Sequence, residues 1–207
     1  MKSVILVHGL WMPGLAMTPM AGRLSRAGYR CRLFDYAGRD RPLAANAERL
    51  AQFARETGPS HFVGHSLGGL VVLEALNGNR ALAVERVALL ATPARGCLAG
   101  RRLGSYGFGR WMLGESEALW HEGRAARWLR PEPLGIIAGA LPFGLGRTLG
   151  RLPGANDGVV CVDETRIEGA TASVVLPVSH SGMLFSGRVG RELQNFLETG
   201  GFARHAR

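Results

Sequence analysis

A glycine-flanked serine constrains this chain more than any other feature of its sequence. Ser66 lies in the stretch Gly64-His65-Ser66-Leu67-Gly68-Gly69, between the apolar run His61–Val63 and the helix-like pattern Leu70–Leu76. This order predicts a strand, a sharp turn at the serine and then a helix. The residues two before and two after the serine must be small, because larger side chains would collide across such a turn. The serine hydroxyl is then exposed, and the free N–H groups of the helix point toward it.

Apolar strand-like runs alternate with helical patterns along the chain. Strands are expected at Lys2–Val7, Tyr29–Tyr36, Ser60–Gly64, Val84–Ala91, Leu134–Ala140 and Ala172–Val178. Helices are expected at Met17–Ala27, Leu43–Thr57, Leu67–Leu76 and Ser186–Leu197. Strands rich in Val, Ile and Leu are typical of a sheet buried on both faces. The sequence therefore predicts an α/β fold, a parallel sheet with helices on both sides.

One segment departs from this alternation. Residues 94–133 are rich in glycine and arginine, and they hold Trp111, Trp120 and Trp128. Neither an internal repeat nor a low-complexity linker divides the chain, and a length of 207 residues suits one domain. We expect a single domain over residues 1–207, with 94–133 inserted as a lid or cap.

The charge balance does not favour a nucleic-acid partner. The net charge is +9, from 25 Lys and Arg residues against 16 Asp and Glu residues. A basic protein of this kind is able to contact nucleic acid or anionic membranes. The arginines are scattered among acidic residues, however, and no nucleic-acid-binding motif is visible. We therefore interpret the basic residues as a solvated surface.

The cysteines and the apolar runs favour a cytoplasmic protein. Cys31, Cys97 and Cys161 are far apart, odd in number and without a C-x-x-C or Cys/His cluster, so we expect free thiols in a reducing compartment. The N-terminal run Val4–Val7 is shorter than the about 7–15 apolar residues of a signal peptide. No stretch reaches the roughly 20 apolar residues that span a bilayer.

A reactive serine needs a base that accepts its proton. His180 is the preferred base, because it follows the strand expected at Ala172–Val178 and lies in the loop Ser179–Gly182. The other histidines fit less well: His8 and His65 belong to other parts of the site, His61 precedes a strand, His121 is in the 94–133 segment and His205 is in the tail.

The base in turn needs an acid to orient it, in a loop between a strand and the histidine. Asp157 is the preferred acid because Asn156-Asp157-Gly158 is a turn-forming triplet at that place, and Asp163 and Glu164 are the alternatives. The segment 92–94, after the fourth expected strand, has no carboxylate. The order Ser66, Asp157, His180 is the chain order of strand-turn-helix serine hydrolases.

The negatively charged oxygen formed during the reaction needs two backbone N–H donors. Leu67 supplies one, since it follows the serine at the start of the helix. The second donor is expected in the loop His8-Gly9-Leu10-Trp11 after the first strand, with Leu10 preferred and Trp11 as the alternative.

Taken together, these motifs resemble those of bacterial α/β-hydrolases of the small lipase and esterase kind. They are Val4–Leu10, Gly64–Gly69, Asn156–Val160 and Val178–His180, and they extend over nearly the whole chain. The resemblance implies a three-layer sandwich with about six mostly parallel strands in the order 2-1-3-4-5-6. It also implies the triad Ser66, Asp157 and His180, the donors Leu10 and Leu67, and neither a cofactor nor a metal. Many such enzymes carry a lid where this chain has residues 94–133.

The leading hypothesis is hydrolysis of carboxylic esters, by an esterase or lipase, through an acyl intermediate on Ser66. The alternative is a thioesterase or acyltransferase with the same triad, and a catalytically silent scaffold would be expected to lack a triad member. Trp11, Trp111 and Trp120 are expected to line the substrate pocket. Arginines of residues 94–133 would then meet lipid headgroups or an acidic substrate. We expect a small-molecule or lipid ester as partner, transient contact with a membrane through 94–133, and a monomer or small homo-oligomer.

Overall fold

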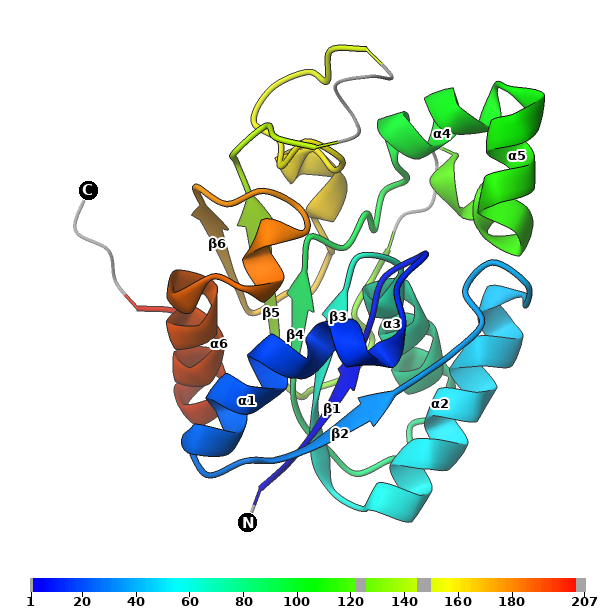
Figure 1. The fold of residues 1–207 in the computed structure, drawn as a ribbon. Helices are drawn as coiled ribbons and strands as arrows, with labels where there is room; N and C mark the ends of the chain where they lie inside the picture. The colour runs from blue at the N-terminus through cyan, green and yellow to red at the C-terminus, as the bar shows by residue number, and fades with distance from the viewer. Residues whose placement is uncertain (1, 122–125, 145–149, 204–207) are drawn as a thin grey trace.

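Six strands form one parallel sheet at the centre of the computed structural model, which describes residues 2–121, 126–144 and 150–203 (Figure 1). They are β1 (Ser3–Val7), β2 (Arg30–Phe34), β3 (Ser60–His65), β4 (Val84–Leu90), β5 (Leu134–Gly139) and β6 (Ala172–Leu176). Their order is β2-β1-β3-β4-β5-β6, and every neighbouring pair is parallel. The expected fold class and strand order are confirmed. All carboxyl ends of the strands therefore lie at the same edge of the sheet.

Helices cover both faces of the sheet and complete three layers. The alternation of side chains along β1 shows the division, because successive residues of a strand point to opposite faces. Val4 and Leu6 pack in the core under α1 (Thr18–Arg26) and α6 (Gly187–Thr199). Ile5 and Val7 pack in the second core, under α2 (Leu43–Thr57) and α3 (Leu67–Gly78). All four β1 side chains are fully buried, as the apolar run predicted.

The helix boundaries follow from local signals. Helix α2 has the predicted bounds and ends at Gly58, whose φ of +81° a residue with a Cβ rarely adopts. Helix α6 begins after Ser186, whose hydroxyl accepts a hydrogen bond from the Val189 N–H at 3.3 Å. The helix predicted at Met17–Ala27 differs, because the 3₁₀ turn η1 (Gly14–Met17) precedes it and α1 starts only at Thr18.

Residues 94–121 of the segment 94–133, called the cap segment below, lie beyond the carboxyl ends of the strands (Figure 1). Residues 126–133 lead back to the start of β5, and the Arg130 side chain donates to the Leu76 and Leu82 carbonyls. The cap segment forms α4 (Leu98–Gly104), α5 (Gly107–Leu113) and the 3₁₀ helix η2 (Gly114–Trp120). Trp120 and Trp128 are buried in the core that also contains α2 and α3. Residues 122–125 of this segment and His205 of the tail lie outside the described residues. Over the described parts of the chain, the helices are all too short or too polar to cross a membrane.

Candidate active site

Ser66 lies alone at the turn between β3 and α3. Strand β3 ends at His65 and α3 begins at Leu67, so the serine is the single residue that reverses direction. Its φ of 53° and ψ of −125° are strained for a residue with a side chain. Such strain persists only where the surroundings hold it. Here the Ser66 N–H donates to the Leu90 carbonyl of the neighbouring strand at 2.9 Å.

Three glycines allow this turn to pack against the sheet. A Cβ on Gly64 would lie 2.5 Å from the Gly69 Cα, and one on Gly68 would lie 2.5 Å from the Val7 carbonyl oxygen. A Cβ on Gly69 would overlap the Thr92 side chain. The collision across the turn was expected for the first two glycines. The requirement at the third was missed, although the doubled Gly68-Gly69 was the signal for it.

Asp157 and His180 form a buried pair. His180 Nδ1 lies 2.7 Å from Asp157 Oδ2, and the His180 backbone N–H donates to the Asp157 carbonyl at 2.9 Å. The other carboxylate oxygen accepts the N–H groups of Val159 at 2.9 Å and Val160 at 2.7 Å. Asp157 is fully buried, so these donors replace the water that an exposed carboxylate would have. The carboxylate is therefore held in one orientation against the imidazole.

The two alternative acids have other partners. Asp163 pairs with Arg166 at 2.8 Å on the surface. Glu164 is largely buried, and its carboxylate accepts the N–H groups of Leu98 at 2.6 Å and Cys161 at 2.7 Å. Burial raises the pKa of Glu164 above its ordinary value. Glu164 therefore joins the 3₁₀ helix η4 (Val162–Thr165), which follows Asp157, to the start of α4.

His65, the residue before the serine, contacts the loop of the predicted base. Its Nε2 lies 3.1 Å from the His180 carbonyl oxygen, and the two rings are 4.8 Å apart. Burial, followed by the nearby charge of His180, lowers the pKa of His65 to about 3. The neutral ring carries one N–H, which donates from Nε2 to the His180 carbonyl.

The loop after β1 lies against the serine. A Cβ on Gly9 would lie 3.2 Å from the Ser66 Cβ. Burial lowers the pKa of His8, whose Nε2 accepts the Tyr36 N–H at 3.2 Å, and Nδ1 therefore donates to the Gly9 carbonyl at 2.8 Å. In a trans peptide the C=O and the following N–H point in opposite directions. The Leu10 N–H is thereby turned away from His8.

Several of the predicted site residues line a cavity of about 390 Å³. Loops at the carboxyl edge of the sheet contribute Gly9, Leu10, Trp11, Met12, His65, Ser66, Pro93, Val159, Val160, His180 and Ser181. The cap segment contributes Cys97, Ala99, Gly100, Leu103, Met112, Leu113 and Trp120. Among the described lining residues there is no Asp, Glu, Lys or Arg. Burial raises the pKa of the Cys97 thiol to about 12, so this wall of the cavity is uncharged at neutral pH.

The three tryptophans expected at the substrate pocket have different positions. Trp120 is buried in the cavity wall, and Trp11 lines the cavity while remaining half exposed. Trp111 does not line the cavity: it is 62% exposed, stacks on Phe108 with 5.5 Å between ring centroids, and lies under the Arg39 guanidinium. Trp111 therefore lies on the face of α5 that is turned away from the cavity.

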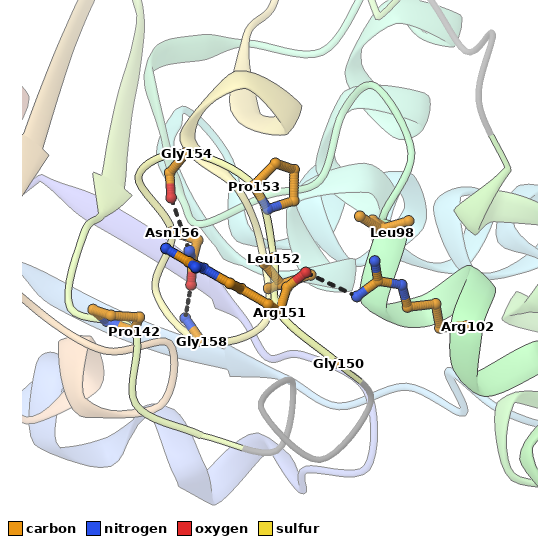
Figure 2. A pocket seen from close by; sticks show the side chains of 10 residues that line it. All are labelled: Leu98, Arg102, Pro142, Gly150, Arg151, Leu152, Pro153, Gly154, Asn156 and Gly158. Atoms are coloured by element: carbon orange, nitrogen blue, oxygen red, sulfur yellow. Dashed lines mark hydrogen bonds between the residues drawn. The ribbon is translucent and has the colours of Figure 1, made fainter.

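A second cavity of about 1010 Å³ lies against the loop that carries Asp157 (Figure 2). Figure 2 shows Arg102 of α4 reaching the Arg151 carbonyl, a hydrogen bond of 3.1 Å. Neither Ser66 nor His180 is among the described residues that line this cavity. In the described parts of the chain, no group of three or more His, Cys, Asp or Glu side chains is arranged to hold a metal ion.

Comparisons with known proteins identify the family and the fold. A model of the alpha/beta hydrolase family matches residues 4–186. A comparison with curated proteins finds no match. Among solved structures, the lipase BlEst2 of Bacillus licheniformis in its propeptide form matches with a TM-score of 0.82 and 21% identity. That match covers 100% of this chain and 52% of the lipase chain, so this chain spans about half the length of that form.

Two further solved structures cover most of both chains. The mature form of the same Bacillus licheniformis lipase has a TM-score of 0.78 and 22% identity, over 95% of this chain and 91% of that one. A thermophilic esterase from Thermogutta terrifontis, with malate bound, has a TM-score of 0.69 and 17% identity, over 96% and 90%. Likeness at such identities establishes the shared fold.

Proposed function

Because the chain belongs to the alpha/beta hydrolase family, we propose that it hydrolyses carboxylic esters through an acyl intermediate on Ser66. His180 is the general base and Asp157 the acid that orients it. The observation that carries the proposal is the 2.7 Å contact between His180 Nδ1 and the buried Asp157 carboxylate, beside a cavity that both His180 and Ser66 line.

Acylation begins with attack of the Ser66 Oγ on the ester carbonyl carbon. The His180 Nε2 accepts the hydroxyl proton, and the carbonyl oxygen becomes an oxyanion. The N–H groups of Leu10 and Leu67 donate to this oxyanion, and the positive end of α3 adds to its stabilisation. The C–O bond to the alcohol then breaks, and the alcohol leaves with the proton from His180.

Deacylation repeats these steps with water. His180 accepts a proton from a water molecule, whose oxygen attacks the acyl carbon, and the same N–H donors hold the second oxyanion. The bond to the Ser66 Oγ breaks, and the serine regains its proton from His180. The products are a carboxylic acid and an alcohol, and the enzyme returns to its starting state.

Asp157 has two roles in this scheme. It accepts a hydrogen bond from the Nδ1–H of His180, so that Nε2 is left free to act as the base. Its negative charge also stabilises the imidazolium that forms in each step. Because Val159 and Val160 already hold its second oxygen, little reorganisation is needed when the charge on His180 changes.

Residues 97–120 of the cap segment contribute one wall of the cavity, and we propose a single domain over residues 1–207 with 94–133 as its cap. Trp11 and Trp120 contact the substrate, and the Ala99, Leu103 and Met112 side chains form an apolar surface for its acyl group. With an uncharged lining, an uncharged acyl group is favoured over a charged one.

The experiment is replacement of Ser66 by Ala, followed by kinetics on p-nitrophenyl butyrate. Loss of the nucleophile is expected to lower kcat/KM by at least about 10³-fold. Circular dichroism and Tm of the variant serve as the control for folding. Turnover that survives in a folded S66A variant would rule out the acyl-serine mechanism.

A further inference from the structure

The inner wall of the cavity is built by the cap segment. Helix α4 contributes Ala99, Gly100 and Leu103, and η2 contributes Trp120. A Cβ on Gly100 would lie 2.7 Å from the Trp120 Cγ, so the indole already packs against the helix backbone. Trp120 is 4% exposed and belongs to the main core. This wall is therefore packed as tightly as a protein interior, and it yields little space to a ligand.

One end of the cap segment is joined to η4, the 3₁₀ helix that follows Asp157. The Cys97 N–H donates to the Trp120 carbonyl at 2.9 Å, which links the start of α4 to the end of η2. Glu164 accepts the Leu98 N–H at 2.6 Å, and the Arg95 N–H donates to the Glu164 carbonyl at 3.0 Å. These are buried or partly buried contacts, which water replaces at a cost.

The other end is joined to two different loops of the domain. The indole N–H of Trp11 donates to the Met112 carbonyl at 2.9 Å. The Arg39 side chain donates to the Trp111 carbonyl at 3.1 Å, and the Arg39 carbonyl accepts the Glu115 N–H at 2.8 Å. A cap that swings open would have to break all these contacts together and expose Leu113, which is 2% exposed.

The size and lining of the cavity define what fits under this cap. One methylene or ester oxygen needs about the volume of one water molecule, roughly 30 Å³. A volume of about 390 Å³ then accommodates an ester group with at most about ten acyl carbons. Carbons beyond that number would lie outside this cavity, and we expect them to add little to binding.

We infer that residues 94–121 of the cap segment form a fixed wall, and that the substrates are uncharged, water-dissolved esters with acyl chains of medium length, about six to ten carbons. The inference rests on the proposed function of the same site. It excludes two behaviours: activation at a lipid–water interface, which needs a cap that opens, and a preference for long-chain lipids, which needs a longer cavity.

The first test is a series of p-nitrophenyl esters from two to sixteen carbons, kept below their solubility limits or dispersed in a fixed detergent. Each methylene that enters the cavity is expected to raise kcat/KM by up to about fourfold. The rise should stop between six and ten carbons. A kcat/KM that continues to rise to sixteen carbons overturns the inference.

Two variants test whether the cavity wall sets the length of the acyl chain, one by making the cavity smaller and one by making it larger. A99F places a ring in the cavity and removes room for roughly three methylene groups, so the optimum should shift to shorter esters. L103A should shift the optimum by two to three carbons toward longer esters, and it remains informative if A99F does not fold.

Matched controls make the same substitutions away from the cavity. Ala118 is exposed on η2 and Leu119 is partly buried there, and neither lines the cavity. A118F and L119A should keep the wild-type optimum. If the cavity variants also keep it, these residues do not set the length of the acyl chain.

The last arm distinguishes this inference from the proposed function. Rates on a short ester are measured across its solubility limit, and a fixed cap predicts smooth saturation. A jump above that limit overturns the fixed cap while leaving the serine mechanism intact. If the wild-type protein hydrolyses no ester and a fluorophosphonate fails to label Ser66, the proposed function itself is wrong.

Discussion

At the scale of single residues, His65 connects the two sides of the candidate site. It precedes Ser66 on β3, and its ring N–H holds the backbone carbonyl of His180 at 3.1 Å. Because its pKa is lowered to about 3, the ring stays a neutral donor at neutral pH. An error of about 1 Å in the position of a reacting group is able to cost 10²-fold in rate.

Replacing His65 tests this positioning role. H65F keeps a flat ring but loses the donor, and it should lower kcat by about 10- to 100-fold with little change in KM. H65Q restores an N–H donor and should recover part of the rate. The measurement is steady-state kinetics on a short ester. Equal rates for the two variants would show that the hydrogen bond contributes nothing.

His61 predicts how stability depends on pH. Burial, together with the charges of Arg86 and Lys2, lowers its pKa from 6.5 to about 4 in the folded state. The unfolded chain therefore binds a proton below pH 6.5 that the folded chain does not. The contribution of His61 to the free energy of unfolding is complete above pH 6.5. It falls toward pH 4 by up to about 1.4 kcal/mol per pH unit.

The measurement is urea unfolding at pH 7.5 and pH 5 for the wild type and for H61F, which keeps a ring beside Tyr29. The loss of stability between the two pH values should be smaller in the variant. An equal loss in both proteins would contradict the assignment to His61, since His65 and the other titrating groups are unchanged.

At the scale of elements, the contact of α3 with β1 sets the position of the serine turn. G68A would place a methyl group against the carbonyl oxygens of Val7 and His8, which cannot move without disturbing the strand. We expect a loss of at least about 2 kcal/mol and a lower Tm.

G78A is the matched control on the same helix. A Cβ there meets nothing within 4 Å, so the substitution should be neutral or slightly stabilising. Thermal unfolding of both variants is the measurement. Equal Tm values would mean that the approach of α3 to β1 is not as close as the structure has it.

The elements differ in how well the sequence predicts them. Strand β1 and helix α2 are predicted almost to the residue. The unbroken apolar run of β1 indicates a buried strand, and the helical spacing of apolar residues in α2 indicates an amphipathic helix. The cap segment was predicted only as an insertion. Helices α4 and α5 have seven residues each, and each contains two glycines, so neither is long enough to show a helical period in its sequence.

The candidate site shows the same limit. Ser66, Asp157 and His180 follow strands and lie in turns, so motif and chain order predict them as a triad. The structure brings Asp157 and His180 into contact. The position of Trp111 depended on which face of α5 meets the cavity, and its contact with Arg39 joins residues far apart in the sequence. The sequence favours Asp157 through its turn-forming triplet and keeps Glu164 as an alternative, since the contact of Glu164 with Leu98 is made only by the fold.

At the scale of the whole molecule, the parallel sheet explains why residues from five separate segments meet. The loops after β1, β3, β4, β5 and β6 all begin at the same edge, and the cavity lies there. The net charge of +9 is not part of this arrangement, since the described lining of the cavity has no Lys or Arg. The proposed chemistry therefore depends on the buried pair and the strained turn rather than on the overall charge.

The most direct test is peptide mass spectrometry after reaction with a fluorophosphonate. The account predicts one adduct, on the peptide that contains Ser66, with labelling abolished in H180A and slowed by about 10³- to 10⁴-fold in D157N. An adduct on another residue, or labelling of H180A at the wild-type rate, would contradict it.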